Sequence, residues 1–147
     1  MTEPADRTQD APQRRRLEAL VRRLSDEDLA RPLPDGWTVA AVLAHLAFWD
    51  NRVAVLLERW RRTGVGPSAI DVDAVNEAAK PQWLALPARA AAEGAVRAAR
   101  AVDAALDAAD PSLLQQIAAT NALNLSRARH RTEHLDQIEA AVSAQTG

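Results

Sequence analysis

The chain of 147 residues contains no cysteine. It therefore has no disulfide, no thiolate metal ligand and no cysteine nucleophile, so any nucleophile must be another side chain, a water or a bound cofactor. Tyrosine is also absent and phenylalanine occurs once, so four tryptophans supply nearly all of the aromatic surface. This composition excludes cysteine-dependent enzymes and thiolate-based metal sites.

An excess of positive charge is lacking as well. The 18 basic and 20 acidic residues give a net charge of −2 and are interspersed along the chain. A protein that binds the phosphates of a nucleic acid usually carries a basic patch or stripe. We therefore expect no nucleic-acid partner.

Long apolar runs are also missing. Residues 1–15 are polar and of mixed charge, without the apolar core of a signal peptide. No later apolar run approaches the roughly eighteen uninterrupted residues of a membrane span. We expect a cytoplasmic protein without a membrane partner, and a chain of this length suffices for a single domain over residues 1–147.

Strand-like alternation is absent, and apolar residues recur at spacings of three and four. This periodicity predicts an all-α protein with four long helices, over about 9–24, 39–63, 88–109 and 111–143. A weaker helical stretch over 71–80 is expected to end before Pro81. Whether Asn121 and Asn124 interrupt the last helix stays open, because asparagine is a poor helix former that packing can tolerate.

Helix boundaries are marked by local signals. Ser25, Thr38 and Asp110 are each placed to cap a helix that follows. Gly64 lies just past the second long helix, where a residue with positive φ is favoured. These positions support the predicted bounds.

Three histidines are present, and two form the pattern His130-x-x-x-His134 on the last predicted helix. Residues four apart lie one turn apart on one helix face, so both imidazoles can point at one ion. His45 lies on the second long helix beside an apolar stripe that includes Val42 and Trp49. An unpaired imidazole there would be costly to bury. The pattern favours a divalent-metal site, and packed or solvated histidines are the alternative.

Two segments resemble a known family. Residues 36–50, GWTVAAVLAHLAFWD, resemble the second-helix signature of the DinB-like superfamily, which includes the N-terminal domain of mycothiol-dependent maleylpyruvate isomerases. Residues 130–138, HRTEHLDQI, are similar to that family's closing motif, a histidine pair one turn apart followed by a Gln-Ile step. The resemblance implies a DinB-like four-helix bundle in which His45, His130 and His134 bind zinc or nickel.

The resemblance implies a function only in outline, because the superfamily includes thiol-dependent transferases and isomerases, toxin-resistance proteins and many proteins of unknown activity. We predict a transferase or isomerase that acts on a small electrophilic molecule with a low-molecular-weight thiol such as mycothiol or bacillithiol. A metal ion held by three neutral imidazoles keeps its charge and an open position, and it would deprotonate that thiol. The alternatives are a metal-dependent hydrolase and a non-catalytic, stress-associated protein that binds a metal or ligand.

A homodimer is also expected. The family resemblance suggests it, and the alanine-rich helix over 88–109 could pack closely against a second copy. The partners predicted from the sequence are thus a small-molecule substrate and another copy of the chain.

Two acidic residues near the histidines are candidates for further roles. Glu133 is a catalytic candidate, although an exposed glutamate on a salt-bridged face is the simpler interpretation. The pattern His130-x-x-Glu133-His134 also matches the inverted zinc-protease signature, for which an all-helical chain is a poor context. Asp50 lies five residues after His45, beyond ideal same-face spacing, so it is a candidate for orienting a ligand rather than binding the metal.

Trp49 and Asn76 are candidates for binding a cofactor. Trp49 is close enough to His45 in sequence to wall a pocket, with core packing as the simpler interpretation. Asn76 resembles an asparagine that often follows the second helix in the family, with a surface position as the alternative. Arg127, Arg129 and Arg131 are interpreted as a solvated helix face, with anion steering at a pocket mouth as the alternative.

Overall fold

The structure, a computed structural model, describes residues 5–144. These residues form helices and loops, with one isolated bridge between Pro32 and Thr38. The helices are α1 (Asp10–Arg23), α2 (Asp26–Leu29), the 3₁₀ turn η1 (Pro34–Gly36), α3 (Val39–Thr63), α4 (Val72–Ala85), α5 (Ala88–Ala108), α6 (Pro111–Thr120) and α7 (Ala128–Ser143).

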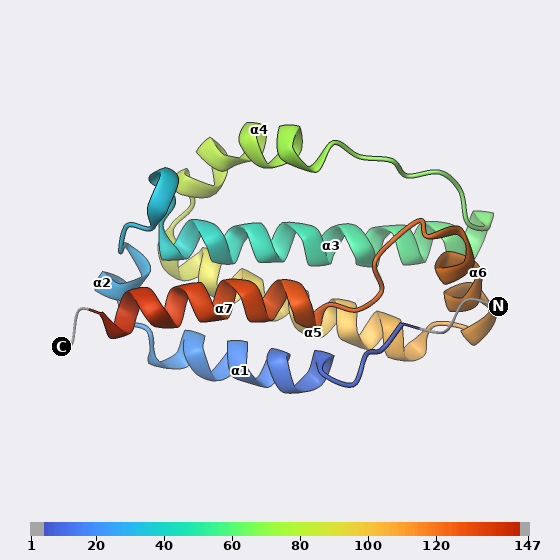
Figure 1. The fold of residues 1–147 in the computed structure, drawn as a ribbon, viewed down its shortest axis with the longest axis horizontal. Coiled ribbons are helices and arrows are strands. Elements are labelled where there is room, and N and C mark those ends of the chain that lie inside the picture. Colours follow the sequence, from blue (N-terminus) through green and yellow to red (C-terminus); the bar gives the residue numbers. More distant parts are fainter. Residues whose placement is uncertain (1–4, 145–147) are drawn as a thin grey trace.

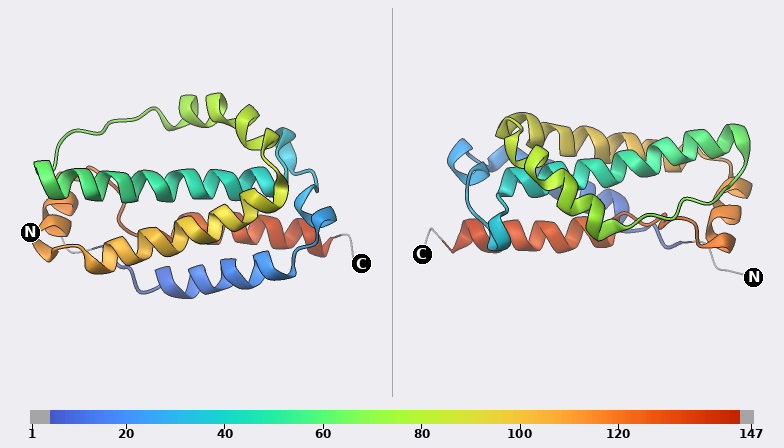
Figure 2. Two further views of the ribbon diagram at one scale, coloured as in Figure 1. Left: turned by 180° about the vertical axis from the view of Figure 1, so that it is seen from behind. Right: turned by 90° about the horizontal axis from the view of Figure 1, so that it is seen from above.

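Four helices, α1, α3, α5 and α7, lie side by side as a bundle (Figures 1 and 2). α3 and α5 run in one direction along the bundle, and α1 and α7 run in the other (Figure 1). The long connection from α3 to α5 carries α4, which returns along the outside of α3. The predicted all-α four-helix bundle is therefore confirmed.

The bounds of α3 agree with the sequence-based prediction. Thr38 Oγ1 accepts a hydrogen bond from the N–H of Ala41 at 3.1 Å, and Gly64 follows the helix with a φ of 79°. Among the described helices, α3 is long and apolar enough to cross a membrane, but 67% of its most apolar window is buried inside the bundle. Burial of this kind is typical of the core helix of a bundle.

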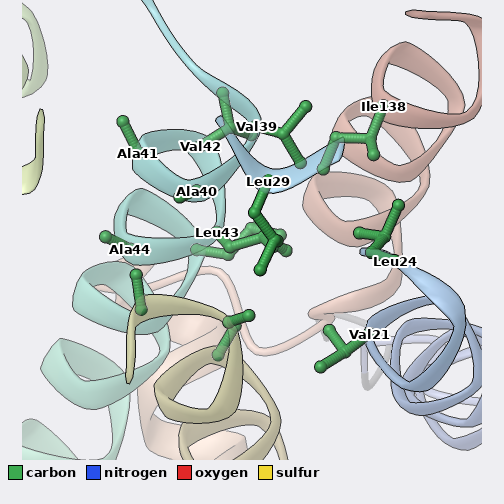
Figure 3. Packing of buried hydrophobic residues seen from close by; sticks show 14 of the residues in the cluster. Val21, Leu24, Leu29, Val39, Ala40, Ala41, Val42, Leu43, Ala44 and Ile138 are labelled. Carbon is green, nitrogen blue, oxygen red and sulfur yellow. The ribbon is translucent and has the colours of Figure 1, made fainter. Parts of the chain in front are cut away.

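The apolar core consists of two clusters. Leu29 and Leu43 lie in the middle of the first cluster, and Ile138 of α7 packs at its side (Figure 3). The second cluster lies further along α3 and includes Val53, Leu57, Trp60, Val102, Leu106, Ile117 and Leu125. Each fully buried side chain of this size contributes roughly 1.5–3 kcal/mol. Residues 47–52 of α3 lie between the two clusters. Buried charged residues, Asp50 among them, occupy this part of the bundle interior.

The helix that was expected to end before Pro81 continues through it as α4. Proline removes one backbone hydrogen bond, so this continuation needs compensation. Trp83, two residues later, is buried and its ring lies 5.9 Å from that of Trp37 and 5.3 Å from that of His45. The predicted end was wrong because burial of this indole keeps the chain helical beyond the proline.

The last predicted helix is two helices, α6 and α7. Asn121 adopts a left-handed conformation with a φ of 54°, which asparagine tolerates better than most residues, and it ends α6. Asn124 Oδ1 then accepts a hydrogen bond from the N–H of Ser126 at 3.0 Å and forms a turn. α7 consequently begins at Ala128, two residues before His130.

Candidate metal centre

The structure brings the three histidines together. His45 comes from α3, and His130 and His134 come from successive turns of α7. Their candidate ligand nitrogens all lie within 4.8 Å of one another. His45 Nε2 is 2.9 Å from His130 Nε2, and each pair of rings has its centroids 4.9 Å apart in an edge-to-face arrangement. The convergence expected from the sequence is therefore present.

All three imidazoles are held in the neutral form. Burial, assisted by the neighbouring His134 and opposed by Asn76, lowers the pKa of His45 from 6.5 to about 4. Burial likewise lowers the pKa of His130 to about 3, assisted by the other two histidines and by Arg127 and Arg131. Burial lowers the pKa of His134 too, against the opposing hydrogen bond with Gln137. Neutral imidazole is the form that binds metals.

The donor set fits a divalent metal ion. His134 Nδ1 lies 3.2 Å from Gln137 Oε1, so an Nδ1–H can donate to this oxygen and leave Nε2 as the metal-binding atom. His45 Nδ1 is buried without a hydrogen-bond partner among the described residues, so the polar contact of this ring is made through Nε2. Three imidazole nitrogens that converge from two helices are a donor set that would hold zinc or nickel.

A cavity of about 750 Å³ opens beside the histidines. Its walls come from α3, the start of α4, α7 and the loops that precede α3, α4 and α7. The apolar lining is formed by Trp37, Val42, Trp49, Val53, Ile70, Val72 and Leu123. The polar lining includes Arg52, Asn76, Asn124, Arg127, Arg129, Glu133 and Gln137. A cavity of this size and mixed lining is typical of a small-molecule site.

Trp49 and Asn76, the cofactor-binding candidates from the sequence, lie in the cavity wall and contact each other. Trp49 Nε1 donates a hydrogen bond to Asn76 Oδ1 at 2.9 Å, which joins α3 to α4. Trp37 and Trp83, which the sequence did not single out, pack their rings 5.8 and 5.3 Å from that of His45. These indoles shield one side of His45 from water.

The two acidic candidates lie in different surroundings. Glu133 is exposed at the rim of the cavity, where its Oε1 lies 3.3 Å from Arg129 Nε. Asp50 is buried away from the cavity lining, and its Oδ1 accepts a hydrogen bond from Arg127 Nε at 2.8 Å while its Oδ2 lies 3.3 Å from Arg131 Nη2. Asp50 therefore contacts the arginines beside His130 and no histidine.

The interpretation of Arg127 and Arg131 as a solvated face is wrong, although Arg129 is exposed as expected. Arg131 is 1% exposed and Arg127 is 6% exposed. Arg131 makes two hydrogen bonds to the carboxylate of Asp103 on α5, at 2.8 and 2.9 Å, and a third at 3.0 Å to the backbone carbonyl of Asp10 on α1. The buried carboxylates of Asp50 on α3 and Asp103 on α5 thus compensate the two buried guanidinium groups.

Asp10 connects α1 to the start of α7. Its Oδ1 accepts hydrogen bonds from the backbone N–H groups of Arg127 and Ala128, both at 2.9 Å. These N–H groups belong to the first turn of α7, which leaves them without partners in the helix. The residue that caps this helix is thus distant in sequence, and it binds the backbone two and three residues before His130.

Comparison with known families gives one finding. A profile of the family described as the mycothiol maleylpyruvate isomerase N-terminal domain matches residues 11–132. The matched segment includes His45 and His130 and stops two residues before His134. Comparison with curated proteins and with solved structures gives no match.

Proposed function

We propose that this chain, which belongs to the mycothiol maleylpyruvate isomerase N-terminal domain family of the DinB-like superfamily, binds one divalent metal ion, zinc or nickel. In this proposal it transfers or isomerises a small electrophilic molecule with a low-molecular-weight thiol, mycothiol or bacillithiol. The observation that carries the proposal is the convergence of three neutral imidazoles, from His45, His130 and His134, at the wall of an open cavity.

The bound metal would supply positive charge that favours loss of the proton from a thiol, whose pKa is otherwise about 8.5. The protein's own residues prepare the site for it. Gln137 orients His134 by accepting from Nδ1, and Trp37 and Trp83 hold the ring of His45. Side chains that fix the ligands in this way reduce the reorganisation needed on binding.

The cavity has room for both reactants. Trp49, held by its hydrogen bond to Asn76, gives one wall a flat apolar surface. A site open to solvent and partly apolar favours an enzyme over a structural metal site, which is normally closed by four protein ligands. Hydrolysis by metal-bound hydroxide uses the same residues and is the main alternative.

The experiment that tests this function compares turnover with and without a thiol. Zinc-loaded and nickel-loaded protein would be incubated with a panel of small electrophiles in the presence or absence of mycothiol or bacillithiol. We expect turnover that needs both the metal and the thiol and that is lost in His130→Ala. Arg62→Gln, an exposed change on α3 away from the cavity, serves as the control.

Other outcomes point to the alternatives. Turnover that needs the metal and no thiol would indicate a hydrolase. An absence of turnover across the whole panel would favour a non-catalytic metal-binding or ligand-binding protein.

We also propose a cytoplasmic homodimer that acts on a small molecule, without a nucleic-acid or membrane partner. The alanines of α5 do not support the dimer in the way the sequence suggested, because Ala92, Ala95 and Ala99 are buried within the chain itself. Exposed apolar side chains such as Val55 and Leu86 are the better candidates for a contact. Sedimentation at high micromolar concentration tests the dimer, and a clean monomer would remove it.

A further inference from the structure

Arg52 is a cation in the cavity wall that no carboxylate balances. The other two arginines that line this cavity are paired, Arg127 with Asp50 at 2.8 Å and Arg129 with Glu133 at 3.3 Å. Arg52 forms no ion pair with any described residue, and its hydrogen bonds come from Nη2 alone, to the carbonyl and hydroxyl oxygens of Ser68, both at 2.8 Å. Within residues 5–144 its Nε and Nη1 have no hydrogen-bond partner.

Arg52 lies on the same helix as His45. It follows His45 by seven residues on α3, which is two helical turns or about 10 Å along the helix axis. Trp49 lies between them, with its ring centroid 5.9 Å from the guanidinium carbon of Arg52. Arg52 also lines a second cavity, of about 530 Å³, that shares Ile70, Leu123 and Asn124 with the first. A ligand that extends from the histidines along Trp49 would therefore reach this guanidinium.

The surroundings of Arg52 favour an anion. Its side chain is half-buried, and burial and the positive charge of Arg127 both lower its pKa. An oxyanion placed here would meet N–H donors that have no partner and would compensate a guanidinium that lacks a counter-ion. The Ser68 hydrogen bonds hold the group in place, so little conformational entropy is lost when a ligand binds.

We propose that Arg52 binds the anionic group, a carboxylate or a phosphate, of a ligand whose apolar body lies along Trp49 and whose reacting end lies at the three histidines. The ligand class is therefore an amphipathic small molecule with an oxyanion at one end. The inference rests on the proposed function for the identity of the reacting end, whereas anion binding at Arg52 can be measured without turnover or metal.

The test is calorimetric titration of the full chain with 4-phenylbutyrate and with 4-phenylbutanol, its uncharged counterpart. Loss of a hydrogen bond to a charged group changes affinity by about tenfold or more. Arg52→Gln should therefore weaken binding of 4-phenylbutyrate by about tenfold or more and change binding of 4-phenylbutanol by less than about twofold. Arg52→Lys, which keeps the charge, should bind 4-phenylbutyrate with an affinity between those of wild-type protein and Arg52→Gln. Arg62→Gln, the same change on the exposed face of α3, should leave both affinities unchanged.

The titrations are run on metal-loaded protein and on chelator-treated protein. Anion binding by Arg52 is thereby tested independently of metal binding by the histidines. Selectivity for 4-phenylbutyrate without metal supports the role of Arg52 even where the metal proposal fails. Phenyl phosphate, a third probe, shows whether Arg52 binds a phosphate in the place of a carboxylate. The inference is overturned where wild-type protein binds 4-phenylbutyrate no better than 4-phenylbutanol, or where Arg52→Gln weakens both to the same extent. Unchanged helical circular dichroism shows that the variants are folded.

Discussion

Asp50 Oδ1 accepts a hydrogen bond from Arg127 Nε at 2.8 Å, and this buried ion pair joins α3 directly to the start of α7. Asp50 follows His45 by five residues, and Arg127 precedes His130 by three. The pair therefore connects the two helices that carry the candidate metal ligands. Removal of one partner leaves a buried charge uncompensated, which typically destabilises a protein by about 3–5 kcal/mol.

Asp50→Asn is expected to lower the free energy of unfolding by about 3 kcal/mol and to weaken metal binding by about tenfold. Urea denaturation of the metal-free protein gives the first value, and a metal titration gives the second. Asp136→Asn is the matched control, because Asp136 pairs with Arg16 at the exposed surface of α7 and should change stability by less than about 1 kcal/mol. Equal effects of the two substitutions would contradict the account of Asp50.

Asp10→Ala removes the cap of α7 that α1 provides. Loss of a capping side chain destabilises by about 1–2 kcal/mol, and here two buried N–H groups also lose their acceptor. Hydrogen exchange should therefore accelerate at residues 127–130, while Leu135 in the middle of α7 keeps more of its protection. Uniform loss of protection along the whole helix would indicate that Asp10 stabilises the fold and has no local role at the histidine pair.

Stability should fall in mildly acidic solution when the metal is absent. The pKa of His45 falls from 6.5 in the unfolded chain to about 4 in the native protein, and those of His130 and His134 are also lowered. Below pH 6.5 the unfolded state therefore binds protons that the native state does not, and each histidine destabilises the native state by up to about 1.4 kcal/mol per pH unit.

This dependence is measured by urea denaturation between pH 7 and pH 5 in the presence of a chelator. His130→Phe should show a shallower slope than wild-type protein, because one of the groups that takes up a proton on unfolding has been removed. Parallel slopes for the two proteins would show that the histidines do not control this loss of stability.

Much of the fold could be predicted because its signals are local. The cap at Thr38 and the glycine at position 64 fix the ends of α3, and the four-residue spacing of His130 and His134 fixes their common face. The continuation of α4 through Pro81 could not be predicted, because it depends on tertiary burial of Trp83 against residues of α3 and the loop before it.

The buried charges were missed for a related reason. Arg131 meets Asp103 at a separation of 28 residues and Asp10 at a separation of 121, so no local pattern reveals these partners. One signal was available in the sequence: Asp50 and Asp103 each follow an apolar residue on a helix whose neighbouring residues are mostly apolar. A carboxylate at such a position indicates a buried cation on another element.

The central claim is that His45, His130 and His134 together bind one divalent metal ion. Its most direct test is a measurement of zinc and nickel binding by elemental analysis and competitive titration, on wild-type protein, His45→Ala and Asp136→Asn. We expect one ion per chain in wild-type protein and in Asp136→Asn, and affinity lowered by about 100-fold or more in His45→Ala, with helical circular dichroism retained. Wild-type protein without stoichiometric metal, or His45→Ala with wild-type affinity, would contradict the claim.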